Sequence, residues 1–264
     1  MPQFGTFALL FALTLSGYSL IVGAMALWRL SSGNDLRAER LLETSRRAGI
    51  GTWITVSCAA FALIYAAFTN DFSIEYIREH TNRDLNPLYK FSALWSGQEG
   101  SLLFWAWLLA TYGFVLRLRH KVDRRLYAYA SVILSAVQLF FLLLVNFAAH
   151  PFALSTQVAQ DGNGLNPLLQ YPEMVIHPPM LYLGYVGFSV PFAFALGALI
   201  MKYPGEKWIR ITRRWTMVTW LFLTCGIFLG AHWAYSVLGW GGYWGWDPVE
   251  NASLMPWLAG TAFL

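Results

Sequence analysis

Glycine and large aromatic residues alternate near the end of the chain, over residues 238–251. The order there is Leu-Gly-Trp-Gly-Gly-Tyr-Trp-Gly-Trp-Asp-Pro-Val-Glu-Asn. Four glycines within seven residues disfavour a helix, and they let the backbone approach a ligand while the rings present their faces. Such a shelf of indole rings suits a large, flat, apolar molecule such as haem. The competing interpretation is an interfacial belt, because Trp and Tyr favour the depth of the lipid headgroups.

The acidic residues of this segment have a structural interpretation. Asp247, Pro248 and Glu250 are spaced as the N-cap, N1 and N3 residues of a helix. We therefore predict that Asp247 and Glu250 cap a helix rather than act as catalytic acids. The cap would also fix how the aromatic segment sits on the rest of the protein.

His177 is the candidate metal ligand of the chain. It precedes Pro178 and Pro179, which favour a stiff, extended backbone, so the sequence predicts a ring held at the mouth of an apolar segment. Imidazole is a common ligand of haem iron. The alternative is an interfacial histidine without a partner, and both interpretations stay open at this point.

Three further side chains are candidates for lining a pocket beside the aromatic segment: Trp95, Glu99 and His232. Trp95 and Glu99 belong to a glycine-broken stretch that forms either a re-entrant turn or the entrance of an apolar segment. His232 lies within an apolar segment shortly before the glycines. An ionisable residue there is a functional candidate, or it hydrogen-bonds a neighbouring helix.

The elements that must position these residues are long apolar segments. Hydrophobic residues make up 57% of the 264 residues and charged residues 12%. Soluble domains typically have ~45–50% apolar residues and ~25% charged residues. A seventh apolar segment begins near Asn251 and reaches Leu264 too soon to complete a crossing, so we expect an N-terminal part of a longer protein. Six others approach or exceed the ~20 residues that a bilayer requires: Gly5–Trp28, Ala48–Thr69, Gly100–Leu116, Leu126–Phe147, Pro179–Met201 and Trp215–Tyr235.

The predicted fold is an all-α polytopic membrane helix bundle over residues 1–264, without a separate soluble domain. Three connections carry five Lys or Arg each, and the other three carry the remaining three of the 18. We interpret this bias as a topology signal rather than nucleic-acid binding. The positive-inside rule then places the N-terminus outside, together with the segments 70–99, 148–178 and 236–250.

The segment Trp240–Asn251 resembles the tryptophan-rich WWD signature of the haem-handling proteins of cytochrome c biogenesis. Two further stretches, residues 93–103 and 176–185, are similar to the CcmF type of haem lyase subunit and to the related NrfE type, which serves nitrite reductase. The resemblance covers the whole chain and corresponds to the N-terminal part of the longer family protein.

This resemblance implies that the WWD segment cradles haem at the outer face of the cytoplasmic membrane. It makes His177 one axial ligand of the haem iron. It places the second axial histidine, and the ligands of a further haem b inside the membrane, beyond Leu264. The haem-binding residues that it implies are Trp240, Gly241, Gly242, Tyr243, Trp244, Trp246, Asp247, Pro248, Glu250 and Asn251.

The implied chemistry is thioether formation, in which the two thiols of a C-x-x-C-H segment add across the haem vinyl groups. The chain contains no such segment, so we expect it to position haem for an unfolded apocytochrome c. The other implied partners are a haem chaperone, the thiol-handling subunits of the maturation system and membrane lipid, with a quinol left open. The expected location is the bacterial cell inner membrane, with the functional face outside.

Two other classes of function remain as alternatives. A haem export or delivery protein with the same signature is one, although fewer spans precede the signature in that class than the six predicted here. A non-haem transporter or quinone-linked subunit is the other. Such proteins usually carry ionisable residues within their spans, whereas the predicted spans hold none apart from His177 near an end and His232.

Overall fold

A computed structural model of the chain describes residues 1–32, 35–118, 123–156, 159–237 and 242–264, apart from the side chains of Asp35 and Glu206. Short turns of 3-10 type lie at Ala93–Trp95 and Pro167–Leu169, and a π-helical turn lies at Leu144–Ala148. The helices are α1 (Pro2–Ser31), α2 (Asp35–Thr69), α3 (Glu75–His80), α4 (Pro87–Ser92), α5 (Gln98–Leu118), α6 (Arg124–Leu143), α7 (Pro172–Gly187), α8 (Ser189–Met201), α9 (Gly205–Val237) and α10 (Pro248–Phe263).

Six helical segments in the described ranges are long and apolar enough to span a membrane. They correspond to the six predicted spans, with α7 and α8 together forming the fifth. Large apolar side chains such as Phe7, Phe61 and Phe228 are exposed on the outside of the helices, as expected for surfaces that face lipid. The predicted all-α, polytopic membrane fold is confirmed, and the chain is a multi-pass membrane protein.

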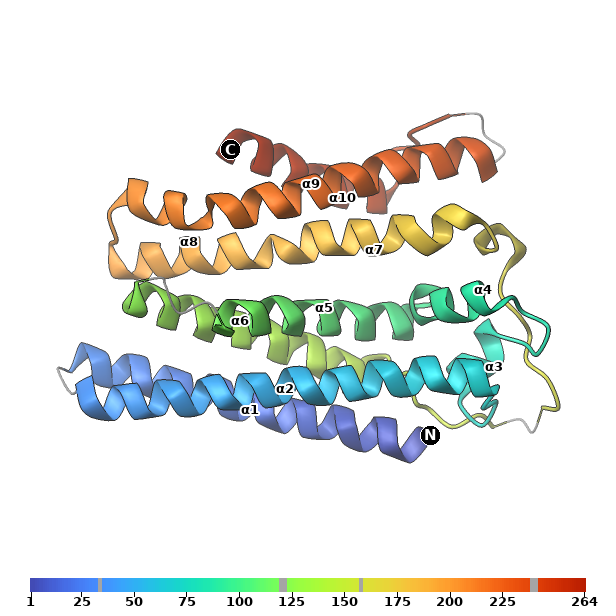
Figure 1. The fold of residues 1–264 in the computed structure, drawn as a ribbon, viewed down its shortest axis with the longest axis horizontal. Coiled ribbons are helices and arrows are strands. Elements are labelled where there is room, and N and C mark those ends of the chain that lie inside the picture. Colours follow the sequence, from blue (N-terminus) through green and yellow to red (C-terminus); the bar gives the residue numbers. More distant parts are fainter. Residues whose placement is uncertain (33–34, 119–122, 157–158, 238–241) are drawn as a thin grey trace.

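The long helices lie side by side in one bundle (Figure 1). α1 and α2 form an antiparallel pair, and α5 and α6 pack next to them. α7 and α8 follow, α9 packs along α7, and α10 packs on α9 and α7. Residues 242–247, the described part of the aromatic segment before α10, therefore lie on the opposite side of the bundle from α1.

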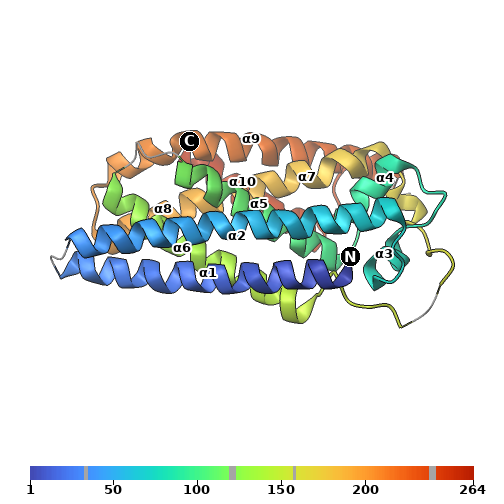
Figure 2. The ribbon, with the colours of Figure 1, turned by 60° about the horizontal axis from the view of Figure 1, so that its bottom comes forward.

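The two ends of the bundle differ in what they carry. α1, α5 and α8 end where α2, α6 and α9 begin, and we call this the inner end. The N-terminus, α3, α4 and the start of α10 lie at the opposite end, which we call the outer end (Figures 1 and 2). This alternation agrees with the arrangement predicted from the distribution of Lys and Arg.

The spans contain charged residues that the sequence analysis assigned to connections. Arg117 lies within α5 and is 6% exposed, and Glu43 and Arg46 lie within α2, which begins at Asp35 rather than near Ala48. Helices extend beyond their most apolar stretch, and long cationic side chains near helix ends are tolerated there. The expectation of spans without such residues was therefore wrong, and it no longer argues against the non-haem alternative.

Two reciprocal hydrogen bonds join α1 to α2. The Ser19 hydroxyl donates to the Ser45 carbonyl oxygen at 2.9 Å, and the Ser45 hydroxyl donates to the Ser19 carbonyl oxygen at 2.7 Å. Both side chains are buried. Hydrogen bonds between membrane helices are worth about 0.6–2 kcal/mol each, so this pair fixes how the two helices sit against each other.

Candidate functional site

Helix α10 begins with the predicted capping box. Asp247 Oδ1 accepts a hydrogen bond from the Glu250 backbone N–H at 2.7 Å, and Glu250 Oε2 accepts one from the Asp247 backbone N–H at 3.3 Å. Glu250 Oε2 also accepts from the Gly245 N–H at 2.8 Å, which ties the aromatic segment to the helix start. Both carboxylates therefore cap the helix, as predicted.

The aromatic rings in the described part of the segment are not coplanar. Trp244 and Trp246 lie at 84° to each other, with ring centroids 5.9 Å apart. Trp246 has a left-handed backbone with φ 57° and is 69% exposed, whereas the indole Nε1 of Trp244 is buried. Tyr243 stacks on Tyr235 near the end of α9, with centroids 4.6 Å apart. These rings therefore do not form the expected flat shelf.

Other residues of the segment contribute through their backbone. Asn251 Nδ2 donates to the Trp246 carbonyl oxygen at 3.0 Å. Gly242 has open space around it, since a Cβ there would meet nothing closer than 4.0 Å. Pro248 occupies the first position of α10. Trp240 and Gly241, which the resemblance implies as haem-binding residues, lie outside the described residues.

His177 lies inside helix α7 rather than in an extended loop before it. The helix begins at Pro172, whose ring suits the first helical position, and continues through Pro178 and Pro179. Each interior proline removes one main-chain donor, and membrane helices tolerate this where other groups satisfy the freed carbonyl. The preference of a residue before proline for extended backbone is overridden here by the packing of α7 on its neighbours.

One hydrogen bond orients the ring of His177. Its Nδ1 lies 2.7 Å from the carbonyl oxygen of Gly226 on α9. Because a carbonyl oxygen only accepts, Nδ1 carries the proton, and Nε2 of the neutral ring presents a lone pair. The ring also lies nearly parallel to the indole of Trp233, at 22° and with centroids 6.3 Å apart. Metal-ligating histidines are commonly oriented by such a hydrogen bond from their second nitrogen.

Glycines on α7 and α9 make this contact possible. A Cβ at Gly230 would lie 2.5 Å from His177 Cε1, one at Gly226 would lie 2.7 Å from the α7 backbone, and one at Gly184 would lie 2.5 Å from the α9 backbone. Gly226 and Gly230 have the G-x-x-x-G spacing that lets membrane helices approach closely. These glycines were not among the residues predicted from the sequence, although their spacing is a recognisable signal.

A cavity of about 170 Å³ lies beside His177, between α7, α9 and the start of α10. The indole Nε1 groups of Trp233 and Trp244, which both line it, are buried and have no hydrogen-bond partner in the described part of the chain. Two unused N–H donors and one imidazole therefore belong to the wall of one cavity. Asp247, Glu250 and Gly230 also contribute to the wall.

The size of this cavity limits what it can hold. Pockets that enclose a small-molecule ligand measure ~300–1,000 Å³, and this cavity has about 170 Å³. The donor chemistry fits haem, because an imidazole lone pair suits iron and an indole N–H suits a propionate oxygen. A haem would therefore contact this cavity with only part of its surface, because the cavity is too small to enclose it.

Trp95, Glu99 and His232 are not among the residues that line this cavity. Trp95 is 5% exposed, and its Nε1 donates to the Met174 carbonyl oxygen of α7 at 2.9 Å. Glu99 is half-buried in the first turn of α5. His232 is exposed, and its Nδ1 lies 2.8 Å from the Glu173 carboxylate, which joins the start of α7 to α9. Trp95 and His232 thus hold the helix that carries His177.

Two other histidines at the outer end serve different contacts. His150 Nε2 lies 3.0 Å from the Thr6 hydroxyl of α1, and burial lowers the pKa of this imidazole. His80 Nδ1 lies 2.9 Å from the Tyr76 carbonyl oxygen, and its ring stacks on Tyr76. Neither residue lines the cavity beside His177.

The fold and this site define a polytopic α-helical membrane protein with a small recess, lined by an imidazole and two indole rings, at the outer end. A sequence profile of the family described as Cytochrome C assembly protein matches residues 95–264, which is more than half of the chain. The chain belongs to this family. The match includes the aromatic segment, His177 and the glycines that pack α7 against α9.

Curated relatives resemble the chain over its whole length. It is 42% identical to the cytochrome c-type biogenesis protein CcmF of Haemophilus influenzae and 40% identical to CcmF of Escherichia coli, with 100% of this chain and 40% of each relative covered. It is 39% identical to NrfE of Haemophilus influenzae, with 100% of this chain and 41% of that relative covered. The chain thus spans about 40% of the length of these relatives.

A solved structure supports the same relationship. The structure titled Cytochrome c Heme Lyase CcmF matches with a TM-score of 0.83 at 33% sequence identity. The match covers 100% of this chain and 41% of that chain. The resemblance to CcmF that was inferred from the motifs is therefore confirmed.

Proposed function

We propose that the protein is a haem lyase subunit of cytochrome c maturation, and that this chain holds haem at the outer face of the bacterial inner membrane. The observation that carries the proposal is the orientation of His177, whose Nδ1 lies 2.7 Å from the Gly226 carbonyl oxygen. That hydrogen bond keeps the Nε2 lone pair available for iron. The names of the relatives, cytochrome c-type biogenesis protein CcmF and NrfE, support the same function.

His177 acts in this proposal as one axial ligand of the haem iron. Trp233 and Trp244 supply indole N–H groups and ring surface at the edge of the haem, since both line the cavity and have unused donors. Because the cavity is small, most of the haem surface lies beyond it, next to the aromatic segment. A haem held on one side leaves its edge accessible, which suits transfer to another protein.

The reaction proposed for the full-length protein is addition of two thiols of apocytochrome c to the two haem vinyl groups. In each addition a carbon–sulfur bond forms, the thiol proton moves to the neighbouring vinyl carbon, and no group leaves. The substrate supplies the nucleophiles, so this chain contributes by orienting haem rather than by a nucleophile of its own. The partners in this proposal are apocytochrome c, a haem chaperone and thiol-handling subunits.

Replacing His177 tests this proposal. In the full-length protein, His177→Ala should abolish cytochrome c maturation while the protein still inserts into the membrane. Added imidazole should restore part of the maturation, or the six-coordinate visible spectrum, because the substitution leaves room for a free ligand. His150→Ala is the matched control, since it removes an outer-end histidine that lies away from the cavity. Full maturation and an unchanged haem spectrum in His177→Ala would refute the proposal.

A further inference from the structure

Arg117 is a buried cation near the inner end of α5, and it is 6% exposed. Its guanidinium fits against two glycines, since a Cβ at Gly49 would lie 2.5 Å from Cζ and one at Gly113 would lie 2.6 Å from Nη1. Nη2 donates a hydrogen bond to the Ser135 hydroxyl at 3.0 Å. The neighbouring helices thus form a fitted space that holds this charge in one place.

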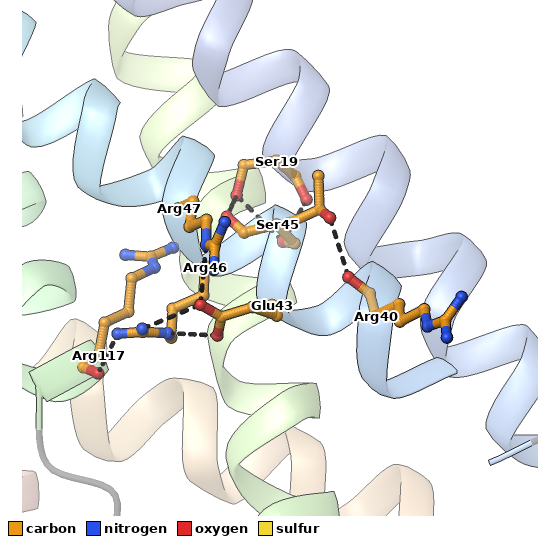
Figure 3. A network of polar contacts seen from close by, with 8 residues as sticks. Ser19, Arg40, Glu43, Ser45, Arg46, Arg47 and Arg117 are labelled. Carbon is orange, nitrogen blue, oxygen red and sulfur yellow. Dashed lines mark hydrogen bonds and ion pairs between the residues drawn. The ribbon is translucent and has the colours of Figure 1, made fainter. Parts of the chain in front are cut away.

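Two other arginines engage the carboxylate of Glu43 (Figure 3). Glu43 accepts hydrogen bonds from Arg46 at 2.8 and 3.1 Å and from Arg47 at 2.9 Å. Arg46 Nη1 also donates to the Arg117 carbonyl oxygen at 3.4 Å, so it stands next to Arg117 as a second cation. Arg117 forms no ion pair within the described ranges. A buried charge without a counter-ion is strongly destabilising, which points to a ligand of opposite charge.

A cavity of about 310 Å³ lies beside Arg117, between α2, α5 and α6. The arginines in its wall are Arg46, Arg117 and Arg124, and the carboxylates are Glu39 and Glu43. Glu39 pairs with Arg124 at 3.0 Å, and Glu43 pairs with Arg46. The positive charge of Arg117 is therefore the one that these pairs leave uncompensated in the wall.

Two hydroxyl groups of the same wall, those of Tyr127 and Ser131, lie close to each other. Both are buried, and neither makes a hydrogen bond of good geometry with the residues that the structure describes. Each can donate one hydrogen bond. Together with the Arg117 guanidinium they supply charged and neutral donors from two helices. An anion with several oxygen atoms would accept from all three.

We propose that this cavity binds a phosphate group, with Arg117 as the charged donor and the Tyr127 and Ser131 hydroxyls as neutral donors. The cavity lies at the inner end of the bundle, and basic pockets between membrane helices on that side recognise anionic headgroups. A phosphodiester of an anionic phospholipid and free inorganic phosphate share this chemistry. The proposal is independent of haem binding, because the site lies at the opposite end of the bundle from His177.

Thermal unfolding of the full-length protein in a neutral detergent tests the proposal and separates the two sources. One arm adds phosphatidylglycerol, with phosphatidylcholine as the reference lipid. The other arm adds inorganic phosphate, with chloride at the same ionic strength as the reference. Stabilisation by phosphatidylglycerol alone identifies a lipid headgroup, and stabilisation by inorganic phosphate identifies the free anion. If neither probe stabilises the protein more than its reference, the proposal fails.

Variants then assign the effect to this cavity. Arg117→Gln should weaken binding of the effective probe about tenfold or more, which is the effect of losing a charge-assisted hydrogen bond. The double variant Tyr127→Phe, Ser131→Ala keeps Arg117 and should weaken binding about fivefold; it decides the question alone if Arg117→Gln does not fold. Arg37→Gln, at an exposed arginine of α2, is the control and should bind as the wild type does. Equal affinity in wild type and cavity variants would overturn the proposal.

Discussion

The indole Nε1 of Trp95 donates a hydrogen bond to the Met174 carbonyl oxygen over 2.9 Å. In an uninterrupted helix that oxygen would accept from residue 178, but Pro178 has no N–H to donate. Trp95 therefore replaces, from outside the helix, a hydrogen bond that α7 lacks. Because Met174 lies about one turn before His177, this contact holds the part of α7 that carries the candidate ligand.

Trp95→Phe should destabilise the protein by about 1–3 kcal/mol, since it leaves a buried carbonyl oxygen unsatisfied. In a Pro178→Ala background the restored N–H can bond to Met174, so the same change should have a much smaller effect. Thermal unfolding of the four proteins in detergent measures this as a double-mutant cycle. If Trp95→Phe lowered the stability equally with Pro178 and with Ala at position 178, Trp95 would act by packing alone.

Gly230→Ala should impair cytochrome c maturation, because the new Cβ would lie 2.5 Å from His177 Cε1 and displace the ring. Overpacking of this kind destabilises by about 1–3 kcal/mol. Added imidazole should not restore maturation, since the displaced ring still fills the site. Gly205→Ala on the same helix is the control, as a Cβ there meets nothing within 4 Å. Normal maturation in Gly230→Ala would exclude a role for the ring position.

Trp244→Ala should reduce maturation more than Trp246→Ala. Trp244 lines the cavity and has a buried indole N–H, whereas Trp246 is 69% exposed. Each aromatic contact is worth about 0.5–1.5 kcal/mol, so the effects are expected to be partial. Maturation of a reporter cytochrome c in a strain without the native protein provides the measurement. If both substitutions reduced maturation equally and only slightly, the rings would act as an interfacial belt rather than as haem contacts.

Acid should lower the stability of the protein through His150, whose ring is partly buried. Burial lowers the pKa of this imidazole from its ordinary 6.5, so the unfolded chain takes up the proton more readily than the folded one. The contribution of the neutral His150 ring to the free energy of unfolding is therefore complete above about pH 6.5. It declines as the pH falls below that value. The unfolding midpoint in detergent should therefore drop less between about pH 7.5 and about pH 5.5 in His150→Gln than in wild type. The same drop in both proteins would contradict this.

A reporter that is active only outside the cytoplasm should work when fused at Gly162 or Gly242 and fail at Gly33 or Gly205. The physical reason is the concentration of Lys and Arg in three of the six connections. Activity measured in intact cells, with the amount of each fusion protein as the control, checks this orientation. The reverse pattern would turn the His177 cavity toward the cytoplasm and remove the basis of the proposed function.

The helical bundle and the start of α10 were predictable because both depend on local sequence. Long apolar segments identify membrane spans whatever their neighbours are. The capping box depends only on Asp247, Glu250 and the backbone between them. In the same way, the signature around Trp244 carried the family resemblance, because it lies in one continuous stretch.

The surroundings of His177 and Arg117 could not be predicted in the same way. The helical backbone at His177 rests on packing against α9 and on the Trp95 contact, which come from distant parts of the sequence. Arg117 directly follows an apolar run, so the sequence predicted that it lies in the connection after a span. In the structure it is buried, because Gly49 and Gly113 leave space for its guanidinium. In both cases the sequence can show that two helices approach closely, as the spacing of Gly226 and Gly230 does, but not which side chain of another helix fills the space.

Ser19 and Ser45 join the first two helices without help from any residue after Thr69. During synthesis α1 and α2 leave the ribosome before α5, so they can insert and pair as a helical hairpin before α5 exists. Ser135 then arrives on α6 with its hydroxyl 3.4 Å from that of Ser19, and Arg117 bonds to Ser135 in turn. We therefore expect the pair of α1 and α2 to act as a template on which the later helices of the bundle assemble.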